Sequence, residues 1–368
     1  MILLRIAAFV AGAALAGYTF YAAALTFVVP RSSASILSGL VFRPMRRLFR
    51  FVAARRSTYE QRDSVMALYA PLSLLLLVPF WLLTTALGFS LIYWSLGLTP
   101  WSAAFIASGS SLLTLGYVTY DTFLFHLFSF AEATSGLMLV AMLIAYLPTM
   151  YSAFQQREAA VSLLEVRAGS PPTAAELIWR LFEMEPDAAD RKRFWERWEQ
   201  IMTEIDESHT ALPALVFFRS PRPGQSWVVA AGTVMDAAAL QQAAVDEPYH
   251  PYPSLAIRAG NAALRHIADF FELPYNPDPH FPADPIQIDR AQFDAACDRL
   301  AAQGVPVKAD RDLAWQNFAG WRVNYDSVLV ALSRMTMAPE VSWLSEKTFI
   351  PANLDRGETA GRLGRIDG

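Results

Sequence analysis

The strongest constraint on this chain is a stretch without lysine or arginine, which runs from Asp63 to Gln156. Two apolar segments inside it, 68–97 and 128–154, each exceed the roughly 20 residues that a helix needs to cross a bilayer. A third apolar segment, 2–29, precedes the stretch and contains one charge, Arg5. Its apolar core is longer than the roughly 7–15 residues of a signal peptide, so we expect an uncleaved membrane helix rather than a cleaved leader. The sequence therefore predicts three membrane-spanning helices.

Composition supports a division into an apolar and a polar part. The 368 residues are 54% hydrophobic and 17% charged, which is too apolar for one soluble globule of this size. The apolar excess lies before about residue 156, and most of the charge lies after it. The net charge of −4 gives no basis for nucleic-acid binding. A single cysteine, Cys297, excludes an intramolecular disulfide and any metal site built from several cysteines.

The segment between the first two apolar segments is rich in arginine. Residues 31–63 contain eight arginines, against Glu60 and Asp63 as acidic side chains. The positive-inside rule places this loop in the cytoplasm, together with everything after Arg157, which follows the third span. Aromatic and aliphatic side chains interleave with the arginines, so the loop is either a helix on the anionic inner leaflet or a solvated basic loop. We expect a multi-pass protein of the bacterial inner membrane, with a cytoplasmic C-terminal domain and anionic lipid near this loop.

A short helix is predicted between the second and third spans. Thr99 and Pro100 form a good helix start, with Thr99 as N-cap and Pro100 at the first helical position. The helix then runs only to Leu113, which is too short to cross a bilayer. The arginine-rich loop and the residues after Arg157 are both expected in the cytoplasm. The chain between the second and third spans must therefore enter the membrane from the outer side and return to that side. Such non-helical backbone is tolerated at membrane depth only inside protein or along a water-filled path, which predicts a re-entrant pore loop.

The order of these segments resembles a known family. An outer helix, a short pore helix, the tetrapeptide Thr-Leu-Gly-Tyr, an inner helix and a cytoplasmic tail, at 63–157, resemble the pore module of tetrameric potassium channels. The filter of that family has the sequence T-V-G-Y-G, and its oxygens replace the hydration shell of the ion. The resemblance covers about a quarter of the chain. It implies a homotetramer that conducts potassium or other monovalent cations, with no cofactor, no metal beyond the permeating ions and no enzymatic activity.

Carried over position by position, the resemblance assigns roles to several residues. The expected filter residues are Thr114, Leu115, Gly116, Tyr117 and Val118. Asp121 is expected in the outer vestibule, where a carboxylate raises the local concentration of cations. Ser108, Ser110 and Ser111 lie on the predicted pore helix, whose C-terminal dipole end favours cations.

Two departures from the family pattern affect the outer end of the filter. Val118 occupies the position of the second glycine, and Thr119 occupies that of the following aspartate. Glycine adopts a left-handed backbone freely, whereas a β-branched residue adopts it only with strain. We therefore expect a distorted outermost ring of carbonyls. A potassium path with fewer ordered sites, a poorly selective cation path and a non-conducting relic are the alternatives, in that order.

The predicted inner helix contains two places where bending costs little, Gly136 and Pro148. They are the candidate gate residues, although Gly136 also fits a site of close helix packing. Glu132 is an ionisable residue in a membrane segment, which indicates either a functional role or a structural hydrogen bond behind the filter. His126 lies near the outer surface, either as a proton sensor or without a role.

The second half of the chain reads as soluble and helical. Helices are expected after the capping-box residues Thr173 and Glu176, from about Asp187, over the apolar segment 226–245, and at 254–271, 290–303 and 312–335. No nucleotide, Walker or zinc motif is present, and the four histidines of this half are scattered.

The resulting prediction is an all-α membrane protein. It comprises an extra N-terminal membrane helix (1–30), a basic cytoplasmic loop (31–65), a potassium-channel-like pore module (66–156), a helical cytoplasmic domain (157–354) and a disordered tail (355–368). The alternative function is a non-conducting, membrane-anchored scaffold or sensor that retains the pore architecture.

Overall fold

The computed structural model of the chain describes residues 2–29, 35–118, 121–185 and 187–339. Within these residues the protein is all-helical, and one isolated bridge joins Val245 to Val307. The chain divides into two compact units. The first comprises 1–154 with Ala211–Phe218, and the second comprises 155–210 with the residues from Arg219 onward. The predicted tail, 355–368, lies outside the described residues.

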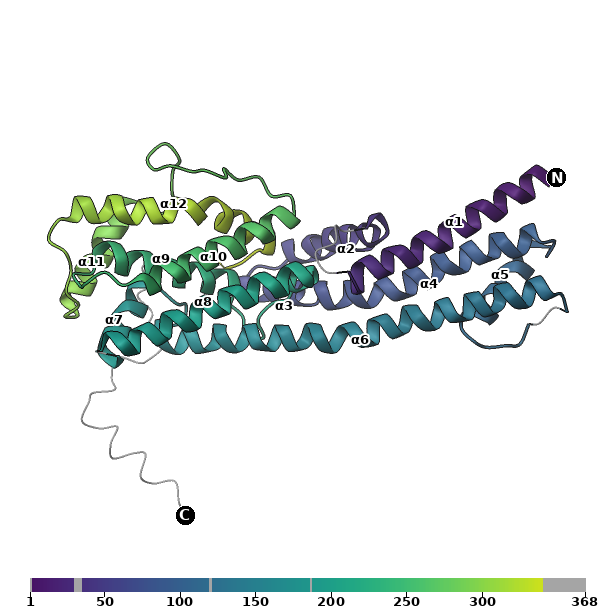
Figure 1. Cartoon of the computed structure of the whole chain (residues 1–368), viewed down its shortest axis with the longest axis horizontal. Helices are drawn as coiled ribbons and strands as arrows, with labels where there is room; N and C mark the ends of the chain where they lie inside the picture. The colour runs from purple at the N-terminus through teal and green to yellow at the C-terminus, as the bar shows by residue number, and fades with distance from the viewer. Residues whose placement is uncertain (1, 30–34, 119–120, 186, 340–368) are drawn as a thin grey trace, which may run out of the picture. The chain divides into compact units, whose positions relative to one another are not determined.

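The first unit contains the helices that are apolar enough to cross a membrane. Its elements are α1 (Ile2–Phe27), α2 (Ile36–Ala54), α3 (Tyr59–Ala67), α4 (Tyr69–Ser95), α5 (Trp101–Leu112), the first part of α6 (Phe123–Ala168) and the short 3-10 helix η1 (Pro213–Phe217) (Figure 1). The three candidate spans among the described residues are α1, the continuous stretch of α3 and α4, and α6. They agree with the three spans predicted from the sequence.

Two glycines bring α1 and α4 close together. A Cβ atom on Gly12 would lie 2.4 Å from the carbonyl oxygen of Gly88, and one on Gly88 would lie 2.9 Å from that of Gly12. The Thr19 hydroxyl also donates to the Thr84 hydroxyl at 3.2 Å. Small residues and interhelical hydroxyl bonds are the usual means of packing helices in membranes. The two helices therefore run side by side over much of their length (Figure 1).

The third span is longer than predicted, because α6 continues past Arg157 to Ala168. No proline or glycine follows Pro148 until Gly169, so nothing in the sequence interrupts the helix. Gly169 then has a φ of 85°, a left-handed conformation that ends helices. The predicted division between 156 and 157 thus falls inside one continuous helix.

The arginine-rich segment is helical, in agreement with the first of the two alternatives left open by its sequence. Ser35 caps α2 by accepting a hydrogen bond from the backbone of Ser38 at 3.1 Å. Thr58 caps α3 in the same way through Gln61. The helical part of that alternative is confirmed, and the position of these helices on an anionic leaflet stays a prediction.

The second unit is built around one buried helix. Its elements are α7 (Ala174–Met184), α8 (Ala188–Ala211), α9 (Trp227–Ala244), α10 (Pro251–Phe270), α11 (Arg290–Ala302), α12 (Arg311–Thr336) and the last part of α6. Helices α7, α10 and α12 surround α9, which is buried on nearly all sides. The helix predicted over the apolar segment 226–245 is therefore the core helix of this unit. The aromatic residues of α8, such as Trp195 and Trp198, are buried too.

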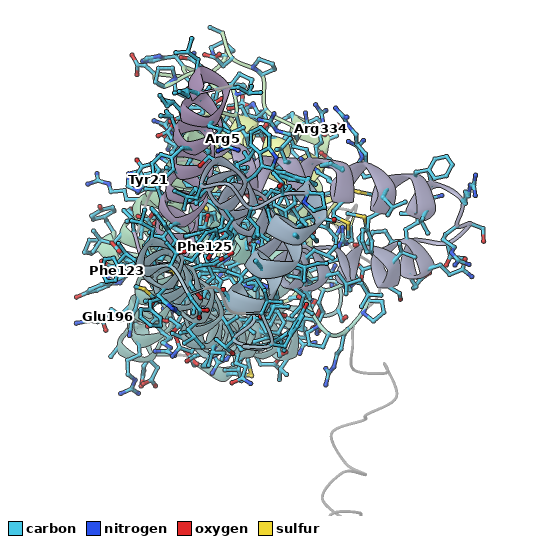
Figure 2. The ribbon with its side chains drawn as sticks, turned by 90° about the vertical axis from the view of Figure 1, so that its right-hand side faces the viewer. Arg5, Tyr21, Phe123, Phe125, Glu196 and Arg334 are labelled. Atoms are coloured by element: carbon cyan, nitrogen blue, oxygen red, sulfur yellow. The ribbon has the colours of Figure 1, made fainter. Side chains whose placement is uncertain are left out.

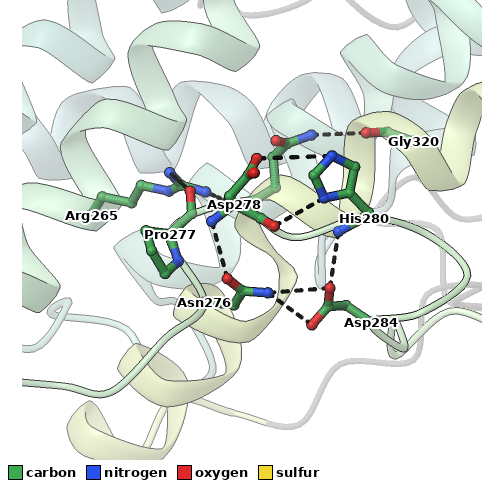
Figure 3. A network of polar contacts seen from close by, with 8 residues as sticks. Arg265, Asn276, Pro277, Asp278, His280, Asp284 and Gly320 are labelled. Carbon is green, nitrogen blue, oxygen red and sulfur yellow. Dashed lines mark hydrogen bonds and ion pairs between the residues drawn. The ribbon is translucent and has the colours of Figure 1, made fainter.

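The loop before α11 is held by its own polar side chains (Figure 3). The Asp284 carboxylate accepts hydrogen bonds from the Asn276 amide at 3.1 Å and from the His280 backbone at 2.9 Å. Asn276 in turn accepts from the backbone of Asp278 at 3.1 Å. Over the described part of the chain, no group of three or more histidine, cysteine or acidic side chains is placed to hold a metal ion. The His280 ring contacts the loop itself, with its Nδ1 atom 3.0 Å from the carbonyl oxygen of Asp278.

One histidine of the second unit is buried in an unusual setting. The Nδ1 atom of His209 lies 2.9 Å from the carbonyl oxygen of Ile205, and its Nε2 atom lies 3.2 Å from an Arg157 amino group. A carbonyl only accepts, so we assign the ring proton to Nδ1, which leaves Nε2 to accept from Arg157. Burial, followed by the positive charge of Arg157, holds the pKa of His209 well below its usual value.

This lowered pKa predicts a loss of stability in acid. Below about pH 6.5 the unfolded chain binds a proton at residue 209 that the folded chain does not. The free energy of unfolding should therefore fall as the pH drops below that value, by up to about 1.4 kcal/mol per pH unit. Thermal unfolding of the purified chain at a series of pH values measures the slope. His209→Gln should flatten it, whereas His280→Gln, at an exposed position, should not. An unchanged slope in His209→Gln would contradict the assignment.

Candidate functional site

The candidate site lies between α5 and α6 in the first unit. Helix α5 has 12 residues and is followed by the non-helical residues Leu113–Val118. The predicted short helix and its non-helical continuation are therefore both present. The predicted cap is wrong in detail: Pro100 is the N-cap residue, and its carbonyl accepts from the Ala103 backbone at 2.9 Å. Thr119 lies outside the described residues.

Left-handed backbone occurs at two alternate positions of this segment. Thr114 has a φ of 55° and Gly116 has a φ of 67°. Val118 is not among the described non-glycine residues with positive φ. Val118 thus does not adopt the left-handed backbone that glycine allows, and the distorted outermost ring of carbonyls stays a prediction. Alternation between left-handed and right-handed residues directs successive backbone N–H groups toward the same side.

The hydrogen bonds show where that side is. Two consecutive backbone N–H groups, of Leu115 and Gly116, donate to the carbonyl oxygen of Ser110 at 2.8 and 3.3 Å. The N–H of Val118 donates to the Ser110 hydroxyl at 3.1 Å. One residue in the last turn of α5 thus holds three N–H groups of the segment.

The carbonyl groups must then point the other way. Among the described residues, each cis peptide bond precedes a proline outside this segment, so the peptide bonds of residues 114–118 are trans. In a planar trans peptide the C=O points opposite to the N–H. The carbonyls of Thr114, Leu115 and Tyr117 are therefore directed away from α5. A row of carbonyl oxygens on one side of a chain is what a ring of several chains needs to ligate a dehydrated cation.

Most of the segment is uncovered within one chain. Leu113, Leu115 and Tyr117 are 54%, 60% and 65% exposed. Val118 differs, because its half-buried side chain packs against an apolar cluster that includes Tyr93 and Ala104. The valine thus anchors the end of the segment to α4 and α5, which gives its side chain a packing role where the family has glycine.

A buried carboxylate behind the segment joins three helices. Glu132 of α6 is fully buried and accepts a hydrogen bond from the Tyr93 hydroxyl of α4 at 2.8 Å. It also accepts a short hydrogen bond from the Ser108 hydroxyl of α5. The structural interpretation of Glu132 is therefore the one that its contacts support. Tyr93 was not predicted as a site residue. Ser108 and Ser110 were expected on the pore helix, but their hydrogen bonds to Glu132 and to the segment were not predicted.

Close packing accounts for one of the two gate candidates. A Cβ atom on Gly136 would lie 2.4 Å from the carbonyl oxygen of Leu112, the last residue of α5. Gly136 therefore lets α6 approach the end of α5. Pro148 is an exposed position inside α6, and its role in a gate stays a prediction.

The predicted vestibule residue, Asp121, lies between the segment and α6, and His126 lies in the first turn of α6. Asp121 and His126 are exposed, and the His126 ring stacks on Phe130 with centroids 6.4 Å apart. At the start of α6, Phe125 stacks on Tyr93 with centroids 5.5 Å apart, whereas Phe123 is 76% exposed. Figure 2 shows Phe123 at the edge of the molecule and Phe125 nearer its interior.

Removing the Glu132 carboxylate should weaken the packing of α5 against α4 and α6 and lower the thermal stability of the protein. Glu132→Ala removes the carboxylate that accepts from the Tyr93 hydroxyl in a buried place, at a cost of about 1–3 kcal/mol. The Ser108 hydroxyl keeps the carbonyl oxygen of Ala86, at 3.0 Å, as an acceptor. Glu132→Gln keeps one acceptor oxygen and should lose less. Thermal unfolding in detergent measures the difference. Glu196→Ala, at a surface pair with Lys192, is the control and should change little. Equal midpoints for the Glu132 and Glu196 alanine variants would refute this role.

No protein-family model, curated protein or solved structure matches this chain. Its class is therefore defined by its fold: an all-helical membrane protein with three candidate membrane-spanning helices. The function rests on the geometry of the segment after α5.

Proposed function

We propose that the protein is a homotetrameric channel for potassium or other monovalent cations, whose filter is formed by residues Thr114–Val118. The observation that carries this proposal is the set of three backbone N–H groups held by Ser110. They leave the carbonyls of Thr114, Leu115 and Tyr117 free to face the axis of a ring. Permeating cations are the ligands of this site, and no other cofactor is proposed.

The charges around the segment favour a cation. The formal charges between Gly88 and Phe154 are Asp121 and Glu132, both acidic. The segment also follows the C-terminal end of α5, where the helix dipole places partial negative charge. The carbonyl oxygens add further negative ends of dipoles. The N–H groups of Leu115, Gly116 and Val118, which could otherwise bind an anion, are held by Ser110.

The uncovered surfaces of the first unit favour a ring of chains. One chain supplies one row of carbonyls, so a closed coordination shell requires several copies around an axis. The non-helical segment also needs protein or water around it at membrane depth, because lipid cannot satisfy its backbone groups. Four copies is the number in the family that the sequence resembles.

We further propose that the membrane is the bacterial inner membrane, with the second unit in the cytoplasm and the gate near Pro148. The arginine-rich helix α2 supports this orientation through the positive-inside rule.

Cation flux into liposomes tests the proposal. The purified chain should carry potassium across the bilayer, with a modest preference over sodium, and native mass measurement in lipid should find tetramers. Tetramers without flux would favour the alternative, a membrane-anchored scaffold that keeps the pore architecture. Monomers or dimers without flux would contradict both the proposed tetramer and the proposed channel function.

A further inference from the structure

Helix α2 has large apolar side chains on two opposite faces. On its inner face Leu37 and Val41 are buried, and the rings of Phe42 and Phe49 lie 6.5 and 6.0 Å from that of Tyr69. Its outer face exposes four large apolar residues by more than half of their surface. These are Ile36, Leu40, Leu48 and Phe51, at 74%, 56%, 54% and 57%. A helix that faces water would bear polar residues at these positions.

Three arginines line this outer face. Arg43 lies three residues after Leu40, and Arg47 lies four residues before Phe51, so both arginines neighbour an apolar residue on the same side of the helix. Arg50 is exposed beside them. Within the part of the chain that the structure describes, none of the three arginines has an ion-pair partner. The outer face therefore combines apolar area with unneutralised positive charge.

The contacts of α2 show where it lies along the length of two candidate spans, α1 and α4. The hydroxyls of Thr26 and Ser38 share a hydrogen bond of 3.0 Å, and Thr26 is in the last turn of α1. The Tyr69 hydroxyl donates to the carbonyl oxygen of Phe42 at 3.5 Å, and Tyr69 is the first residue of α4. Helix α2 thus lies where α1 ends and α4 begins. If these helices cross a bilayer, this is the level of its headgroups.

We propose that the outer face of α2 lies in the headgroup region of an anionic bilayer, where Arg43, Arg47 and Arg50 bind lipid phosphates. The four apolar side chains then enter the boundary between headgroups and acyl chains, as in other interfacial helices. The guanidinium group is planar and forms paired hydrogen bonds to phosphate oxygens. This inference concerns a surface distant in sequence from the filter and does not depend on conduction.

Lipid quenching tests the inference on the full chain. A fluorescent label on Leu40→Cys reports on the outer face, because the native Cys297 is fully buried. The labelled protein is reconstituted into phosphatidylcholine vesicles that contain one quarter phosphatidylglycerol, with bromine atoms on one lipid or the other. Allowing for abundance, brominated phosphatidylglycerol should be enriched around the label by at least about fivefold, the factor that one arginine contributes near an anionic surface.

Charge-matched variants distinguish bound lipid from a general charge effect. In Arg43→Gln/Arg47→Gln/Arg50→Gln the enrichment should fall to about one. The control Arg193→Gln/Arg197→Gln/Arg258→Gln removes the same charge from exposed positions of the second unit and should keep the enrichment. No quenching by either lipid, or equal quenching by both in the unsubstituted arginine background, would overturn the proposal. Abolition of the enrichment by inorganic phosphate would mean that the arginines bind free phosphate, which also overturns it.

Discussion

Gly116→Ala should abolish the cation flux of the protein. Gly116 has a φ of 67°, and an alanine in left-handed backbone costs about 1–2 kcal/mol. In a ring of four chains the cost is about 4–8 kcal/mol, since each chain contributes it once. The segment should relieve this strain by rotating the peptides on either side of residue 116. That rotation turns the Leu115 carbonyl away from the axis, so the ring loses a set of ligands. The measurement is potassium uptake into liposomes.

The matched control is Gly109→Ala in α5. Gly109 has no positive φ, and a Cβ atom on it would meet nothing within 4 Å in the chain. The same chemical change should therefore leave the flux nearly unchanged there. Both variants should remain tetrameric in lipid, because the contacts of α4 with α5 are intact. Flux through Gly116→Ala at the level of Gly109→Ala would show that ions do not pass along this backbone.

Helices were largely predictable from the sequence because apolar length and periodicity fix them locally. The residue at which α6 ends was not predictable in this way. Arg157 and Glu158 looked like the point where the third span enters water, yet their side chains are buried and joined at 2.7 Å. A pair of adjacent opposite charges can neutralise itself, so charge alone did not mark the end of the helix. The next glycine, Gly169, did.

The site was predictable as a segment but not in its backbone geometry. The tetrapeptide after a short helix was enough to locate Thr114 and Gly116. The role of Ser110 depends on how the chain folds back over α5, which no local pattern specifies. The sequence also led to an expectation of a distorted outermost ring of carbonyls, because valine disfavours the left-handed backbone that the family's glycine allows. In this chain the valine keeps a negative φ and packs on the cluster around Tyr93.

The second unit depends on a buried ion cluster whose members lie far apart in the sequence. Asp236 lies in the core helix α9, and Arg322 of α12 contacts it. Arg322 also donates to Asp326 at 2.7 Å, and the Tyr325 hydroxyl donates to Asp236 at 2.9 Å. Arg322, Asp236 and Asp326 are each 4–5% exposed. One guanidinium therefore bridges two buried carboxylates and is the counter-charge that they share.

Arg322→Met should destabilise this unit severely. Methionine fills a similar volume, but it leaves two buried carboxylates without their counter-charge, and breaking a buried pair in this way costs about 3–5 kcal/mol. At about 2–4 °C per kcal/mol for a unit of this size, the thermal midpoint should fall by roughly 6–20 °C. Arg258→Met, at an exposed position of α10, should shift the midpoint little. Adding Asp236→Asn and Asp326→Asn to Arg322→Met removes the stranded charges and should recover part of the loss. If Arg322→Met unfolds at the same temperature as Arg258→Met, or if the added asparagines lower the midpoint further, the cluster does not hold α9 to α12 through charge.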